Sequence, residues 1–221
     1  MKKNRALVLL TSCIMILSVV GCSPATPTAA PPEAPLTIIA SEDYPNYGSV
    51  DALSERADTI VKGNVVQARV EALDDSVQTD SQDPNNSNTA GSAADAQVSF
   101  DKIYTIYTVQ VTESYKGGYT AGDQLEVKQL GGQLGNTEIV NDDSLTLMPA
   151  KDYVLFLETY ADTPASLLNS VQSLYVVKPA PKSSQASQQT QSEVIVSANP
   201  ENDLTLSLSE LQQIKKEQSN P

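Results

Sequence analysis

The sequence predicts a mostly-β domain, a small β-barrel with a short helix near its N-terminal end and an amphipathic helix at its C-terminal end. Several stretches alternate apolar and polar residues with a period of two, as half-buried strands do. One of them, residues 57–73, changes its apolar phase without an intervening turn. The final ordered stretch combines a helix-capping motif with apolar residues at helical spacing. We therefore assign one domain to residues 43–217 and a short tail to residues 218–221.

The N-terminal residues are typical of an export signal. A basic start at Lys2, Lys3 and Arg5 precedes the apolar run 6–20, which is shorter than the ~20 residues that a transmembrane helix needs. A basic start, a short apolar run and a small-residue exit mark a segment that is removed after export. We predict residues 1–21 to be a signal peptide.

The exit of this segment reads Val19-Val20-Gly21-Cys22, which resembles the lipobox of bacterial lipoproteins. The resemblance implies cleavage before Cys22, diacylglycerol on its sulfur and an acyl group on its new amino group. One acyl chain holds a membrane marginally, whereas two or more anchor a protein stably. The predicted partner is thus the lipid bilayer, and the predicted location is the extracytoplasmic face of the cell membrane. The alternatives are an ordinary signal peptide that happens to be cleaved near a cysteine, and an uncleaved anchor.

Composition narrows the chemistry of the exported chain. The chain has no histidine, and no cysteine follows Cys22. These absences exclude Ser-His and Cys-His catalysis and the common zinc sites, and they leave stability to packing instead of disulfides. Removal of the signal leaves 11 basic and 27 acidic residues, so nucleic acid and anionic headgroups are unfavourable partners. A cationic partner is compatible with this charge, and so is an acidic surface that only maintains solubility.

Three segments are predicted to lie outside the regular structure. Residues 22–42 begin with a stretch rich in Pro, Ala and Thr, which we interpret as an extended stalk rising ~3 Å per residue from the membrane. The polar segments 74–99 and 179–192 lack periodicity and are predicted to be disordered insertions. Acidic and amide oxygens between Asp74 and Asp95 leave a weak calcium-responsive module as an alternative, although the ligand spacing of a calcium loop is missing.

The first ordered elements are a helix and a long strand. Ser49 can cap a helix whose inner face contains Val50 and Leu53. In the strand at residues 57–73, the apolar positions change sides between Val65 and Val66. Such a flip without a turn predicts a β-bulge or a bend, as when one strand serves two sheets of a small barrel.

The later elements follow from similar patterns. Five consecutive apolar residues, 153–157, predict a central strand that is buried on both faces. Further strands are expected around residues 107–112, 125–127, 171–178 and 193–197, and glycine-rich turns after residues 116 and 130. No helix and no Lys-Ser/Thr pair follow the second turn, so we expect a hairpin turn or a bulge and not a phosphate loop. Ser207 and Glu210 form a capping box for a final helix that we expect to dock on the domain.

Two sets of side chains are candidates for a site. Carboxylates Glu138, Asp142 and Asp143 could serve an envelope hydrolase if they faced a cleft at a defined separation, although Asn-Asp-Asp-Ser is also an ordinary turn. Five tyrosines are candidates either for a surface patch of binding anchors or for packing in the core: Tyr104, Tyr107, Tyr115, Tyr119 and Tyr153.

The order of the motifs ADTIVKGNVV, YTVQVTESYKGG, DQLEV and YVLFL along residues 57–157 is similar to that of metalloprotease-inhibitor and netrin-like modules. It is also similar to that of a group of uncharacterised bacterial secreted proteins. The resemblance implies a five-stranded, OB-like barrel with a flanking helix. The inhibitory chemistry does not transfer, because those inhibitors bind a protease zinc through a free N-terminal cysteine, and Cys22 would be acylated. Fold likeness alone does not imply function.

These observations favour a membrane-anchored cell-envelope lipoprotein that acts as a non-enzymatic binding or adaptor module. We expect an envelope protein or peptide as its partner, and no cofactor, no metal and no nucleic acid. The hydrolase that uses carboxylates near residues 138–143 and the calcium-responsive module remain the alternatives.

The lipid assignment predicts the result of metabolic labelling with an alkyne fatty acid. The wild-type chain should be labelled and Cys22→Ala should not, because the thiol of Cys22 is the proposed attachment point. The matched control Cys13→Ala should keep its label, since Cys13 lies within the segment that is removed. Labelling that survives Cys22→Ala would refute the assignment.

Overall fold

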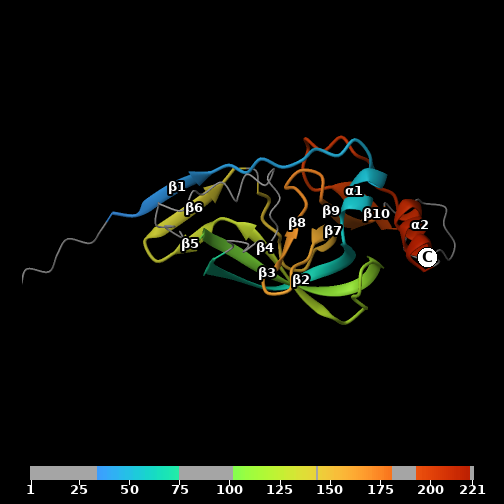
Figure 1. Ribbon diagram of the computed structural model, residues 1–221, viewed down its shortest axis with the longest axis horizontal. Coiled ribbons are helices and arrows are strands. Elements are labelled where there is room, and N and C mark those ends of the chain that lie inside the picture. Colours follow the sequence, from blue (N-terminus) through green and yellow to red (C-terminus); the bar gives the residue numbers. More distant parts are fainter. Residues whose placement is uncertain (1–33, 75–101, 143, 181–192, 220–221) are drawn as a thin grey trace, which may run out of the picture. The chain divides into compact units, whose positions relative to one another are not determined.

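Ten strands and two helices make up the parts of the chain that the computed structural model describes, residues 34–74, 102–142, 144–180 and 193–219 (Figure 1). The elements are β1 (Leu36–Ala40), α1 (Val50–Arg56), β2 (Thr59–Leu73), β3 (Lys102–Lys116), β4 (Gln124–Leu130), β5 (Gly132–Leu134), β6 (Thr137–Asn141), β7 (Asp152–Glu158), β8 (Ala165–Leu167), β9 (Leu174–Pro179), β10 (Glu193–Ser197) and α2 (Leu208–Gln218). The predicted mostly-β fold with two flanking helices is confirmed.

The strands form two sheets. The larger has the order β10-β9-β7-β2-β3-β4-β8, and the smaller has the order β1-β6-β5. The short strand β8 pairs with β4 in parallel and with β7 in antiparallel fashion, so it links two strands that are far apart in the order of the sheet. Closure into an OB-like barrel remains a prediction.

The β2–β3 pair lies at the centre of the larger sheet. The two 15-residue strands run antiparallel from Ile60 and Lys116 to Leu73 and Lys102. Their register shifts between Val65 and Gln67, which leaves Val66 without a partner in β3 and 46% exposed. The β-bulge predicted from the change of apolar phase is therefore confirmed.

Two clusters of buried side chains occupy the two faces of β7. Leu155 and Leu157 belong to a first core cluster together with residues of β2, β3, β4 and β8, whereas Val154 and Phe156 belong to a second core cluster with both helices. This arrangement confirms the prediction of a central strand that is buried on both faces. The second core cluster receives Leu53 from α1 and Leu211 from α2.

Capping residues define where both helices begin. The side chain of Ser49 accepts a hydrogen bond from the backbone N–H of Ala52 (3.1 Å) at the start of α1. At the start of α2, Ser207 and Glu210 form the predicted capping box. α2 contacts β3 and β10, so its predicted docking on the domain is confirmed. Within the described ranges, neither helix combines the length and the apolar character that a membrane span requires.

The predicted stalk at residues 22–42 is too long. Residues Leu36–Ala40 form β1, which pairs in parallel with β6 through all five of its residues. This stretch lacks proline and contains two consecutive isoleucines, which favour a strand over an extended tether. The signal peptide, Cys22 and residues 22–33 lie outside the described residues. So do the predicted insertions, apart from Asp74, which follows β2, and residues 179 and 180 at the end of β9.

β3 lies close against β2 at Gly63, where a second register shift occurs. A Cβ atom at this position would lie 2.5 Å from the carbonyl oxygen of Gln110 and 2.7 Å from Cγ1 of Val109. Because the first of these atoms is backbone, a side chain could enter only if the strands separated. Glycine at this position is therefore a steric requirement of the β2–β3 pair.

We expect Gly63→Ala to lower the free energy of unfolding by about 1–3 kcal/mol, the usual cost of overpacking a core. The matched control is Gly48→Ala, because no atom lies within 4 Å of a Cβ at Gly48. The control should change the stability by less than about 0.5 kcal/mol. Chemical denaturation monitored by circular dichroism measures both values, and equal stability of the two variants would contradict the steric requirement.

Candidate functional site

The tyrosines singled out in the sequence do not form a surface patch. Tyr104, Tyr107, Tyr115 and Tyr153 are each at most 5% exposed, and Tyr119 is half-buried. Burial raises the pKa of the Tyr107 phenol. The alternative of core packing is correct for Tyr107, Tyr115 and Tyr153, which belong to the two core clusters. Tyr104 is buried as well, but it lines the cleft described below.

The candidate carboxylates do not come together in a site. Glu138 is exposed on β6 and Asp142 is exposed in the turn that follows it, whereas Asp143 lies outside the described residues. Neither Glu138 nor Asp142 lines the cleft described below. Across the part of the chain that the structure describes, no group of three or more acidic, histidine or cysteine side chains is placed to hold a metal ion. Apart from Asp74, the proposed calcium segment falls outside that part.

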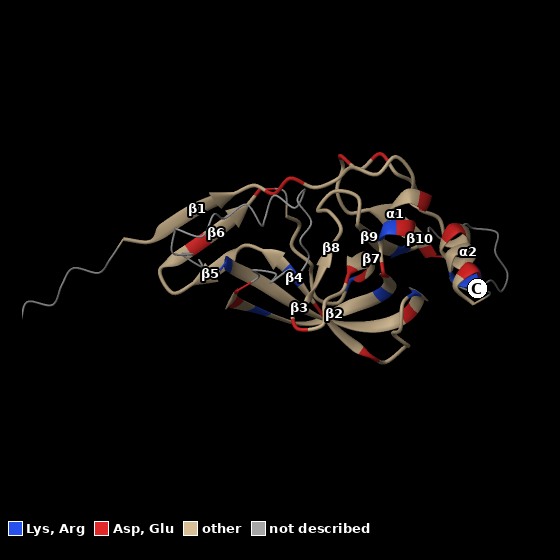
Figure 2. Cartoon of the chain, viewed as in Figure 1, with Lys and Arg blue, Asp and Glu red and all other residues tan. Residues whose placement is uncertain are grey.

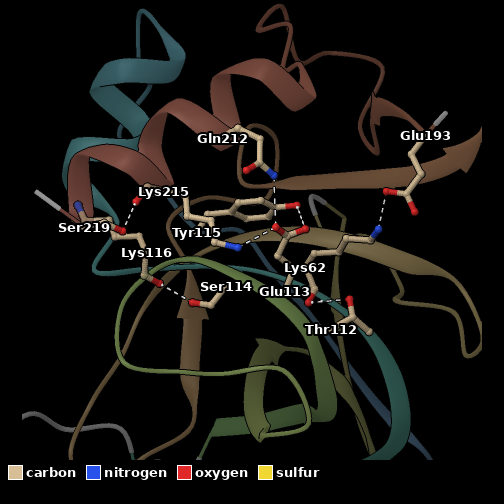
Figure 3. A network of polar contacts seen from close by, with 10 residues as sticks. All are labelled: Lys62, Thr112, Glu113, Ser114, Tyr115, Lys116, Glu193, Gln212, Lys215 and Ser219. Carbon is tan, nitrogen blue, oxygen red and sulfur yellow. Dashed lines mark hydrogen bonds and ion pairs between the residues drawn. The ribbon is translucent and has the colours of Figure 1, made fainter. Parts of the chain in front are cut away.

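A polar network joins α2 to the larger sheet (Figure 3). At its centre, Glu113 of β3 accepts hydrogen bonds from Lys215 Nζ (2.9 Å) and Gln212 Nε2 (3.3 Å) of α2. The hydroxyl of Tyr115 donates to the same carboxylate (3.0 Å). The ammonium of Lys215 also lies 5.8 Å from the centre of the Tyr115 ring, within the range of a cation–π contact.

The charges in this network stabilise the packing of α2 on the sheet. Partial burial acts to raise the pKa of Glu113, but the hydrogen bonds from Lys215, Gln212 and Tyr115 outweigh it, so the pKa lies below its usual value. Burial and the Glu113 charge raise the pKa of Tyr115, which keeps its phenol protonated. Beside this network, Lys62 of β2 pairs with Glu193 of β10. Because these charges are paired within the fold, Glu113 links α2 to β3, and the Lys62–Glu193 pair links β10 to β2.

The strongest candidate for a functional site is a cleft of about 900 Å³, here called the tyrosine cleft. Its lining comes from the segment between β1 and α1, from β3 and β4, and from the chain on either side of β8. Four of the lining residues are tyrosines: Tyr44, Tyr47, Tyr104 and Tyr160. A volume of this size is at the upper end of the usual range for ligand sites.

Lys128 of β4 is held between two of these rings. Its ammonium lies 5.6 Å from the ring centre of Tyr104 and 4.9 Å from that of Tyr160. It also donates a hydrogen bond to Thr163 Oγ1 (3.2 Å). The geometry is that of a cation–π pair on both sides, so this part of the cleft already accommodates an ammonium group.

An ion pair lies next to Tyr160. Arg56 Nη2 of α1 contacts Glu158 Oε1 of β7 at 2.8 Å, and the Tyr160 hydroxyl donates to the other carboxylate oxygen (3.3 Å). Burial and the adjacent Glu158 charge raise the pKa of Tyr160, so the phenol stays protonated at neutral pH. Its hydroxyl donates to Glu158, and its side chain remains 40% exposed in the cleft.

Buried amides fix the wall formed by the segment between β1 and α1. Gln172 accepts a hydrogen bond from the backbone N–H of Tyr47 (2.8 Å) and donates one to its carbonyl (2.9 Å). Asn169 donates to the carbonyl of Pro45 (3.0 Å). Both amides are less than 5% exposed. This irregular segment is therefore positioned by the core, which keeps its two tyrosines in place before any ligand binds.

The tyrosine cleft is suited to binding. It offers aromatic faces, hydroxyl groups and charges of both signs, and none of its lining residues is a histidine or a cysteine. The sequence patterns did not single out Tyr44, Tyr47 and Tyr160, which lie outside the periodic stretches. Two of them flank Pro45 and Asn46 in the run Tyr-Pro-Asn-Tyr, and aromatic residues in such a loop were the only available signal.

The network around Glu113 predicts a pH-dependent contribution to stability. A carboxylate with a lowered pKa stabilises the fold above its usual pKa, and this stabilisation is lost as the pH falls through the lowered value. Glu113→Gln should lower the stability by about 1 kcal/mol at pH 7 and by less at about pH 3. Thermal melts at both pH values measure the difference. The control Glu217→Gln removes a carboxylate that accepts a hydrogen bond from Gln213 of the same helix, and an equal loss there would contradict the role of Glu113.

Comparison with protein families, curated proteins and solved structures finds no match for this chain.

Proposed function

We propose that this chain is a cell-envelope lipoprotein, anchored through Cys22 at the extracytoplasmic face of the membrane, and that its folded domain is a non-enzymatic binding or adaptor module. The tyrosine cleft is the binding site, and its ligand is a peptide segment of an envelope protein. The observation that carries the proposal is the convergence of four tyrosines on one cleft of about 900 Å³. The lipobox-like residues at positions 19–22 support the anchor.

The chemistry of the lining favours a peptide ligand. Tyrosine contributes a large contact area and one hydrogen bond, which is why it is enriched among residues that dominate protein–protein binding energies. The backbone at Pro45 and Tyr47 is held by buried amides, so little conformational entropy is lost there when a ligand binds. Side chains such as Gln129, Thr163 and Ser166 can satisfy the amide groups of a peptide backbone.

The charge of the chain favours basic side chains in that peptide. The acidic residues outnumber the basic ones by 27 to 14, and the cleft is lined by four carboxylates and two basic groups. The position of Lys128 between Tyr104 and Tyr160 shows how aromatic rings of this cleft receive an ammonium group. The partly exposed rings of Tyr47 and Tyr160 can receive lysine or arginine of a ligand in the same way.

We further propose that the strands behind the cleft close into a small OB-like barrel. The support is that β8 pairs with β4 on one side and with β7 on the other, while β7, β2, β3 and β4 are neighbours in the sheet. The motif order that resembles netrin-like modules is consistent with this closure. No observation on the described residues favours the hydrolase or the calcium alternative.

A random-peptide display library panned against the full-length protein tests the proposal. We expect selected peptides to be enriched in lysine and arginine, and Tyr160→Ala to weaken their binding by about tenfold or more, as loss of an aromatic anchor does. Tyr160 is 40% exposed, so its removal should leave the fold intact. The control is Val194→Ala, at a residue that is 41% exposed on β10 and should not affect binding. Failure to select any peptide, or equal binding by both variants, would contradict the proposal.

A further inference from the structure

The smaller sheet carries an exposed set of aliphatic side chains, here called the aliphatic tip. Its members are 42–74% exposed: Leu36, Ile38 and Ile39 of β1 and Leu134 of β5. Monomeric soluble proteins rarely leave large aliphatic side chains grouped on a surface unless that surface meets a partner. The core clusters do not use these residues.

The pairing pattern places Leu36 and Leu134 at the end where the chain enters the sheet, whereas Ile39 stands opposite Val140, toward the other end of β6. Leu36 and Leu134 both stand opposite Thr137 of β6, so they share one face of the sheet, whereas Ile39, an odd number of residues further along β1, points to the other face. The N–H of Leu36 donates to the carbonyl of Asn136 in the β5–β6 turn (2.8 Å). The start of β1 and this turn therefore lie at the same end of the sheet, and aliphatic side chains are exposed on both of its faces.

Charge distinguishes this sheet from the rest of the domain. Glu138 is the one charged residue in β1, β5 and β6, and Figure 2 shows acidic and basic residues on many of the other elements. In a chain with 27 acidic residues, most of the surface is repelled by anionic headgroups. The smaller sheet, whose strands carry Glu138 as their one charged residue, can approach a bilayer at a lower electrostatic cost than these elements.

We propose that the aliphatic tip rests in the headgroup layer of the membrane that holds Cys22. The inference rests on the proposed lipid anchor. Residues 23–35 alone separate Cys22 from Leu36, a distance of at most ~50 Å for a fully extended chain. The smaller sheet therefore contains the first described strand beyond the anchor. Aliphatic side chains gain free energy at the boundary of headgroups and acyl chains.

The smaller sheet enters the membrane only to the level of the headgroups. β1 is an edge strand of the sheet, so the N–H and C=O groups on its outer edge need partners. Water and headgroups supply such partners in the interfacial layer, whereas the hydrocarbon core does not. The aliphatic side chains therefore enter the bilayer surface while the backbone of β1 stays at headgroup level.

Site-directed spin labelling of the acylated protein in phosphatidylcholine vesicles tests this inference. Nitroxides attached to Ile39→Cys and Leu134→Cys should be accessible to oxygen, which concentrates in lipid, and shielded from a water-soluble nickel complex. The matched control Val194→Cys, at a similarly exposed aliphatic residue of β10, should show the opposite order. Equal accessibility at all three positions would mean that the tether holds the domain away from the bilayer, and would overturn the inference.

Two further readouts distinguish membrane contact from self-association and from a missing anchor. Line broadening at the aliphatic tip that disappears on dilution with unlabelled protein would show that a second copy covers the tip, which also overturns the inference. Labelling of the protein without an introduced cysteine would reveal a free thiol at Cys22 and would refute the anchor itself. In that case the proposed function fails, independently of what the tip contacts.

Discussion

The close approach of β2 and β3 at Gly63 is the constraint on which the rest of the structure depends. β2 pairs with β3 on one edge and with β7 on the other, so its position fixes the centre of the larger sheet. At Gly63 the carbonyl of Gln110 occupies the place of a side chain. The bulge at Val66 then redirects β2, and its last residues run with β3 toward the smaller sheet, where Val70 lies against Gly132 of β5. One pair of long strands thus connects both sheets and contributes to both core clusters.

The sequence predicted those elements whose own residues carry a recognisable pattern. The bulge followed from the change of apolar phase at Val65 and Val66, the central strand from the apolar run in β7, and α2 from its capping box. Periodicity could not indicate β5 and β8, because three residues are too few to show a period. It also left β1 within the predicted stalk. The parallel pairing of β1 with β6 joins residues 101 positions apart, and neither segment alone indicates that pairing.

The tyrosine cleft was not predictable for a related physical reason. Alternation within strands identifies positions that face a core, and the tyrosines found in this way are buried. The more exposed aromatic rings of the cleft belong to irregular segments, whose course is set by contacts with distant residues such as Asn169 and Gln172. Asn169 lies outside the periodic stretches, and Gln172 lies in a turn just before β9 that the pattern assigned to a strand. The sequence therefore did not show that these amides would position a segment over a hundred residues away.

The order of the elements, with α2 after all the other described helices and strands, has a consequence for folding. Leu211 and Ile214 complete the second core cluster, and Lys215 supplies the cation that pairs with Glu113. A chain that is synthesised or translocated from its N-terminus exposes this apolar face to water until the residues of α2 arrive. The domain consequently cannot reach its final packing while α2 is still inside the ribosome or a translocation channel. Completion of the second core cluster is therefore coupled to the arrival of α2, the last of the described elements.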